Sequence, residues 1–280
     1  MNFTILNLNK FSPAIYTLLV FLLAQGLGTC LMFGIGLLIS PDLPLHEHMP
    51  TSLLSLILMT VDILAVVCCY FLIHNIQFGA TSDFSAIRWK PGMSAIAGGF
   101  LGALSISILT DSMELPDEVL QTSIAMSHNI WGLLTLVIVG PITEELLFRE
   151  GIAGEMLRRG TNPWIAIMVS ALAFSFMHLN LAQGLYALPL GIIFGIIYYK
   201  TGNIVLTSIL HVLNNGIVVV QLYIMREDFT ELSYSKWFGG DLKAYAAMLV
   251  LGALCIVLMG IFWKSYRPLQ RKLKKVTPIN

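Results

Sequence analysis

Eight long apolar runs divide this chain, and they constrain its fold more than any other feature. They cover roughly residues 14–39, 52–76, 93–110, 130–152, 163–178, 183–200, 204–225 and 244–264. A transmembrane helix needs about 20 apolar residues to cross the hydrocarbon core of a bilayer. Only 11% of the 280 residues are charged, whereas a soluble domain carries about 25%. The sequence therefore predicts an all-α fold, in which residues 1–280 form a single membrane domain with a bundle of about eight transmembrane helices.

The basic residues between these runs predict how the chain is oriented. With a cytoplasmic N-terminus, 12 of the 16 Lys and Arg residues fall in cytoplasmic segments and three in outer loops, while Arg149 lies within a span. Cytoplasmic loops of membrane proteins are enriched in Lys and Arg. We therefore expect an integral, multi-pass protein of the plasma membrane with both termini in the cytoplasm.

Charge also bears on the partners of this protein. The basic segment from Lys264 to Lys275 is expected to contact anionic headgroups, which makes membrane lipids a partner. The formal net charge is zero, so nothing in the bulk charge indicates a nucleic-acid partner.

Polar side chains interrupt the apolar runs at a few positions in the second half of the chain. An ionisable group within a bilayer is costly and is retained where it is paired or functional. The positions of this kind that we interpret as a site are Glu144, Glu145, Arg149, His178, His211 and Asn215.

The spacing of these residues indicates which of them interact. Glu145 and Arg149 are four residues apart, share a helix face and can form an ion pair. Glu144 has no such partner and needs a polar neighbour from another helix, which makes it the better candidate for a general base. Thr161 lies in a turn midway between Glu144 and His178, so a helical hairpin would bring these two to similar depth.

Three short patterns in this region resemble the motifs of a known family. Glu144-Glu145-x-x-x-Arg149, Phe174-x-x-x-His178 and His211-x-x-x-Asn215 match, in order, the motifs of the CPBP (Abi) intramembrane proteases. That family includes the type II CAAX prenyl endopeptidases. The resemblance implies that residues 130–220 form the catalytic core, and that the substrate is a membrane-bound or lipidated protein or peptide.

The resemblance also implies roles for the site residues. Glu144 and His178 would activate a water molecule, and His211 and Asn215 would donate hydrogen bonds to the oxyanion that develops. Glu145 and Arg149 would hold the site in shape. Two His and a Glu are a possible zinc-ligand set, but similarity to the prenyl endopeptidases favours a metal-free, glutamate-dependent mechanism.

Two other classes of function are compatible with the same residues. In a small proton-coupled transporter, Glu144, Asp62 and the histidines would relay protons. In a catalytically silent scaffold or immunity protein, the polar cluster would be structural. Asp62 lies within the second apolar run and would pair with Arg149, support the site or mark an ion path.

Overall fold

The computed structural model describes residues 11–39, 50–77, 82–117, 119–224 and 233–266. All eight predicted spans are helical. They are α1 (Ser12–Ile39), α2 continued by η3 (Thr51–Ile73), α3 (Trp89–Asp111), a composite helix (Ile130–Arg158), α8 (Pro163–Phe176), α9 (Leu181–Thr201), α10 (Val205–Ile224) and α12 (Asp241–Ser265). Within the described residues, seven are long and apolar enough to cross a membrane, and α8 is shorter, with 14 residues. The predicted all-α, polytopic membrane class is thus confirmed.

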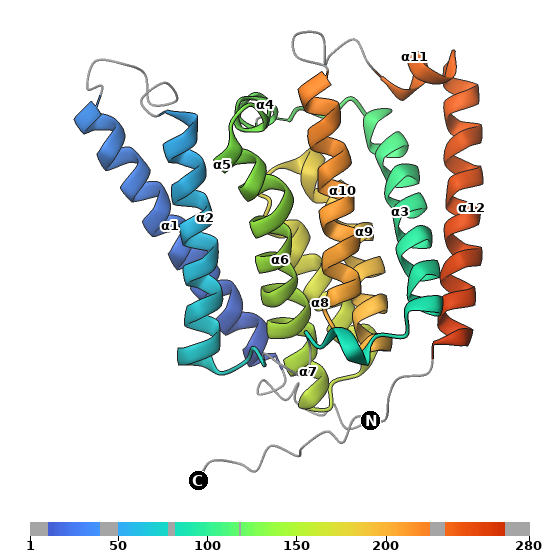
Figure 1. Cartoon of the computed structure of the whole chain (residues 1–280), viewed down its shortest axis with the longest axis horizontal. Helices are drawn as coiled ribbons and strands as arrows, with labels where there is room; N and C mark the ends of the chain where they lie inside the picture. The colour runs from blue at the N-terminus through green and yellow to red at the C-terminus, as the bar shows by residue number, and fades with distance from the viewer. Residues whose placement is uncertain (1–10, 40–49, 78–81, 118, 225–232, 267–280) are drawn as a thin grey trace, which may run out of the picture.

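The spans run alternately up and down and leave short elements at both ends (Figure 1). At one end lie α4 (Leu120–Ser127) and α11 (Tyr234–Phe238), neither of which the sequence predicted. At the other end lie α7 (Glu155–Arg158), the start of α1 and the end of α12. The first described helix therefore begins, and the last one ends, on the same side of the bundle.

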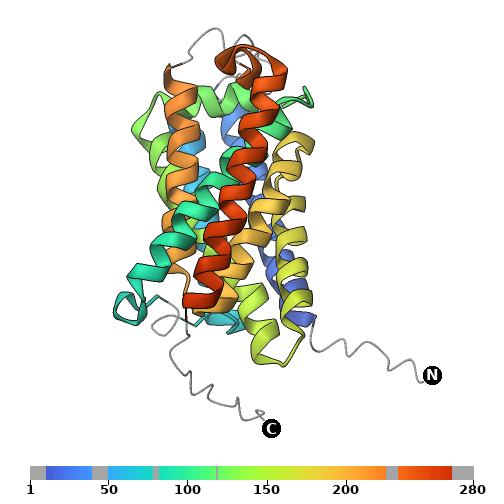
Figure 2. The same ribbon diagram turned by 90° about the vertical axis from the view of Figure 1, so that its right-hand side faces the viewer.

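The bundle has two edges and a more enclosed centre. Helix α12 packs along α3 at one edge, and α1 packs along α2 at the other (Figures 1 and 2). The composite helix, α8, α9 and α10 fill the space between these edges. The three helices that carry the site motifs, namely the composite helix, α8 and α10, thus belong to this enclosed centre.

The composite helix is irregular where it carries the site. It passes from α5 (Ile130–Leu133) into the π-helix η5 (Leu134–Val139), returns to α6 (Gly140–Glu144), and widens again into the π-helix η6 (Glu145–Gly154) before α7. A π-helix bonds residue i to i+5, is rare, and occurs mostly as single turns that are frequent at functional sites. Glu144 and Glu145 lie at the junction of α6 and η6.

Helices α8 and α9 approach closely because glycines of α9 face α8. A Cβ atom on Gly191 would lie 3.2 Å from the Cα atom of Ala171 and 3.2 Å from the ring of Phe174. A Cβ atom on Gly195 would lie 2.8 Å from the side chain of Ile167. The small residues therefore set the helix separation and hold Phe174 in place.

We expect Gly191→Val to destabilise the protein, because the added side chain must displace the α8 backbone or the ring of Phe174. Overpacking of this kind costs about 1–3 kcal/mol, which thermal unfolding in detergent would detect as a lower midpoint. Gly26→Val on α1 is the matched control, because nothing lies within 4 Å of the Cβ position there. Equal destabilisation by both variants would contradict the proposed role of the contact.

Candidate active site

A fully buried ion pair lies at the start of η6. Arg149 Nε is 3.3 Å from Glu145 Oε2, and both side chains are 0% exposed. The guanidinium carbon of Arg149 lies 4.4 Å from the ring centre of Phe174 on α8 and 5.1 Å from that of Phe194 on α9. Burial makes each charge depend on the other, and the two aromatic faces add cation–π attraction.

His211 joins this ion pair to Glu144. Its Nδ1 lies 3.1 Å from Glu145 Oε1, and its Nε2 lies 3.5 Å from Glu144 Oε2. Because Glu145 is paired with Arg149, its carboxylate can only accept a hydrogen bond, so Nδ1 of His211 carries the hydrogen. One further proton, on the Nε2 atom of His211 or on the carboxyl group of Glu144, then makes the contact between these two groups attractive.

Glu144 is the most accessible member of this group. Its side chain is 28% exposed, against 4% for His211 and 0% for Glu145. In the described part of the chain, no hydrogen bond or ion pair other than that with His211 holds its carboxyl group. The sequence prediction that Glu144 needs a polar neighbour from another helix agrees with this contact, but the neighbour comes from α10.

The structure does not bring Glu144 and His178 into contact. Among the residues described, no hydrogen bond or ion pair joins them, and His178 Nδ1 lies 2.8 Å from the carbonyl oxygen of Phe174 instead. Helix α8 ends at Phe176, so His178 falls in the turn beyond it. The prediction that Glu144 and His178 lie at similar depth also assumed regular α-helices with 3.6 residues per turn, whereas η6 bonds residue i to i+5. The predicted hairpin contact is therefore replaced by the contact with His211.

The ring of Phe174 packs against the rings of both histidines. It lies 4.9 Å from the ring of His178 and 5.7 Å from that of His211, edge to face in both cases. A carbonyl oxygen cannot donate a hydrogen bond, so the Nδ1 atom of His178 must donate to Phe174. A neutral His178 therefore presents its Nε2 atom as an acceptor.

Asn215 supports the helix that precedes the glutamates. Its Nδ2 atom donates to the carbonyl oxygen of Leu136 at 3.0 Å. In η5 the N–H of Gly140 donates to Thr135, five residues earlier. The next bond of this pattern would run from Pro141 to Leu136, but proline has no N–H. Asn215 thus satisfies a carbonyl group that Pro141 leaves open. The sequence did not predict this role, although Gly140-Pro141 before the glutamates was its signal.

Asp62 has a partner other than the one considered from the sequence. Its Oδ1 atom accepts a hydrogen bond from Nε2 of Gln25 on α1 at 2.9 Å. Pairing with Arg149 was one of the alternatives for Asp62, but Arg149 forms its ion pair with Glu145. Asp62 also interacts electrostatically with Glu144. It therefore lies at the border of the site and links α1 to α2 there.

Comparison with known proteins covers the part of the chain that holds these side chains. Residues 126–217 match the family model described as type II CAAX prenyl endopeptidase Rce1-like. This range contains all three motifs. This part of the chain is similar to the CPBP intramembrane proteases.

Two curated relatives match the chain at 34% identity. They are the "Putative membrane peptidase YdiL" of Bacillus subtilis, over 83 residues, and the "Membrane-embedded CAAX protease MroQ" of Staphylococcus aureus, over 88 residues. Each match covers 30% of this chain, and the matched regions are 34% and 36% of the two relatives. The similarity thus spans about a third of the length of these relatives. No solved structure matches the chain.

The polar side chains of the site do not converge as a set of zinc ligands in the part of the chain that the structure describes. No three His, Cys, Asp or Glu side chains come together there as a metal-binding group. Both ring nitrogens of His211 face carboxyl oxygens. A catalytic zinc site holds its ion with three protein ligands and leaves a fourth position open.

We expect Arg149→Met to destabilise the protein strongly, because Glu145 would remain buried without its counter-ion. Breaking a buried pair from one side costs about 3–5 kcal/mol. The double variant Glu145→Gln/Arg149→Met removes both charges and keeps an acceptor for His211, so it should be more stable than Arg149→Met alone. Thermal unfolding in detergent measures the difference. A double variant that loses the sum of the two single effects would show that the charges do not depend on each other.

Proposed function

We propose that this protein is an intramembrane endopeptidase that hydrolyses peptide bonds of membrane-associated or lipidated proteins or peptides. The observation that carries the proposal is the arrangement of two neighbouring glutamates with opposite surroundings. Glu145 is buried and contacts both Arg149 and His211, whereas Glu144 is partly exposed and, among the described residues, forms an ion pair only with His211. An accessible carboxylate beside a proton-carrying imidazole is suited to general acid–base catalysis.

In the proposed reaction, Glu144 takes a proton from a water molecule while the water oxygen bonds to the carbonyl carbon of the substrate. The carbonyl oxygen becomes an oxyanion, and the Nε2–H of protonated His211 stabilises it by a charge-assisted hydrogen bond. The peptide C–N bond then breaks, and Glu144 returns its proton to the leaving nitrogen. Each proton that Glu144 takes up is released in the same cycle.

The remaining site residues support this reaction. Glu145 receives the Nδ1–H of His211 and so orients the ring, and Arg149 keeps Glu145 ionised in its apolar surroundings. We assign His178 to the opposite side of Phe174, where its Nε2 atom accepts a hydrogen bond from the substrate. We assign Asn215 to support of η5 through Leu136, as well as to the oxyanion role implied by its motif.

The substrate class and the orientation in the membrane belong to the same proposal. One end of the described bundle carries most of its basic residues, namely Arg88, Lys90, Arg158, Arg159, Lys200 and Lys264. By the positive-inside rule we propose that this end faces the cytoplasm, with both termini on the cytoplasmic side of the plasma membrane. The names of the two relatives, a membrane peptidase and a CAAX protease, are consistent with a membrane-bound peptide substrate.

We expect Glu144→Gln to abolish cleavage, because glutamine cannot accept a proton from water. The measurement is a quantitative comparison of peptide N-termini in membranes from cells that carry the wild type or the variant. Glu114→Gln, at an exposed position between α3 and α4, is the matched control.

Three outcomes of this comparison separate the classes of function. Termini that disappear only in Glu144→Gln identify the substrates of a protease. Identical profiles with loss of proton-coupled flux would indicate a transporter. Identical profiles with retained partner binding would indicate a scaffold or immunity protein, and both of these results would contradict the proposal.

We expect cleavage to be insensitive to EDTA and phenanthroline, because no described group of side chains forms a metal site. The activity of the purified protein in detergent, with a zinc peptidase as a positive control for the chelators, measures this. Loss of activity that zinc restores would overturn the metal-free mechanism.

A further inference from the structure

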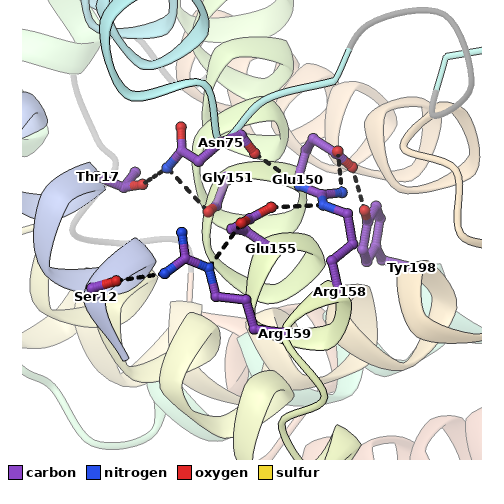
Figure 3. Close-up of polar contacts among 9 residues, drawn as sticks. All are labelled: Ser12, Thr17, Asn75, Glu150, Gly151, Glu155, Arg158, Arg159 and Tyr198. Atoms are coloured by element: carbon purple, nitrogen blue, oxygen red, sulfur yellow. Dashed lines mark hydrogen bonds and ion pairs between the residues drawn. The ribbon is translucent and has the colours of Figure 1, made fainter. Parts of the chain in front are cut away.

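A second buried polar cluster lies one turn beyond the site, and the proposed reaction does not use it. It connects α1, the segment after η3, η6, α7 and α9 (Figure 3). Its members are Ser12, Thr17, Asn75, Glu150, Gly151, Glu155, Arg158, Arg159 and Tyr198. Below we call this set the η6 cluster.

Glu150 is at the centre of the η6 cluster. Its side chain is 0% exposed, its Oε1 atom lies 2.7 Å from Nη1 of Arg158, and its Oε2 atom accepts a hydrogen bond from the hydroxyl of Tyr198. A buried carboxylate costs several kcal/mol unless its oxygens are satisfied. Both carboxyl oxygens of Glu150 therefore have a partner, one in Arg158 of α7 and the other in Tyr198 of α9. Glu150 therefore ties η6 to a second helix.

Arg158 extends these contacts to the other side of η6. Its Nε atom lies 2.7 Å from Glu155 Oε2, and its Nη2 atom donates to the carbonyl oxygen of Asn75 at 2.9 Å. The side-chain amide of Asn75 donates in turn to Thr17 on α1 at 2.6 Å and to the carbonyl of Gly151 at 3.2 Å. The turn of η6 that contains Glu150 and Gly151 is thus held from α1, α9 and the segment after η3.

Helix η6 needs such support because it is an unusual structure. It has ten residues of π-helix, whereas π-helical segments are mostly single turns. Its surroundings also require the present register: Gly154 lies against Tyr198 so closely that a Cβ atom would clash with the hydroxyl group. A change from i→i+5 to i→i+4 bonding would rotate the later residues of η6 about the helix axis relative to its start. Arg149 and Glu150 would then no longer keep their present directions relative to Glu144 and Glu145.

We propose that Glu150 is a positioning residue for the catalytic site. Held between Tyr198 and Arg158, its carboxylate fixes the π-helical register of η6, and this register places Glu144 and Glu145 on the two nitrogens of His211. The expected effect of Glu150 on the cleavage rate rests on the proposed peptidase function. Its expected effect on the position of Glu144 and Glu145 beside His211 does not.

The test compares Glu150→Gln with Glu155→Gln. Glu150→Gln removes the ion pair between η6 and Arg158 of α7, and it retains an acceptor for Tyr198. Glu155→Gln is the matched control, because Glu155 pairs with Arg158 and Arg159 from α7, outside η6. One readout is kinetic: the cleavage rate and KM for a peptide whose cleavage depends on Glu144. The other is the ¹⁵N NMR signal of the His211 ring, assigned with His211→Gln, which reports hydrogen bonding without any need for turnover.

We expect Glu150→Gln to lower kcat by about 10- to 100-fold, the scale of a misplaced catalytic group, with KM nearly unchanged and the His211 signals shifted. Glu155→Gln should leave kcat and the His211 signals as in the wild type. Tyr198→Phe, which removes a single hydroxyl group, should change both readouts in the same direction as Glu150→Gln but less. The Tyr198→Phe variant keeps the test valid if Glu150→Gln does not fold.

Other results would overturn the inference. Unchanged His211 signals in Glu150→Gln and Tyr198→Phe would show that Glu150 does not position the site. Equal losses in Glu150→Gln and Glu155→Gln, in proportion to lowered thermal stability, would reduce the η6 cluster to general stabilisation. If the wild type cleaves no peptide while the His211 signals shift only in Glu150→Gln and Tyr198→Phe, the positioning role stands and the peptidase proposal fails.

Discussion

The buried ion pair between Glu145 and Arg149 is the interaction on which the centre of the bundle depends. Neither charge can lie alone in an apolar interior, and their mutual attraction offsets the cost of burial only with good geometry and further contacts. Those contacts come from three other helices: Phe174 on α8, Phe194 on α9 and His211 on α10. Satisfying one ion pair therefore brings four helices to one point and fixes the position of the histidine.

The difference between two neighbouring carboxyl groups follows from this arrangement. Adjacent residues on a helix point about 100° apart, so only one glutamate of the pair can face Arg149. Glu145 takes that place and becomes structural. Glu144 is directed to the Nε2 atom of His211 with more than a quarter of its side chain exposed, which leaves its carboxyl group accessible. Asp62, held by Gln25, adds a polar border from α1 and α2, which lie outside the range similar to the family model.

The irregular backbone of the composite helix has identifiable causes and supports. Pro141 leaves the carbonyl group of Leu136 without its backbone donor, and Asn215 on α10 supplies one. Further along, the η6 cluster holds the second π-helical segment. In a membrane, backbone groups cannot turn to water, so such irregularity persists only where neighbouring helices satisfy it. Of these two segments η6 is the more enclosed, because all ten of its residues are buried, whereas Thr135 is the one buried residue of η5.

The sequence predicted the eight helices, their approximate limits and the ion pair at positions i and i+4, because apolar length and helix spacing are local properties. The side chains of the site could be named for the same reason, since polar residues are conspicuous in apolar runs. Three contacts depended on the packed bundle instead. They are the contact of Glu144 with a histidine, the hydrogen bond of Asn215 and the hydrogen bond of Asp62. These contacts depend on accumulated rotation along a helix, and two π-helical segments change that rotation in a way that no local pattern records. The Glu145–Arg149 pair could therefore be predicted from spacing, whereas the contact between Glu144 and His211 arose only when α10 packed against the widened helix.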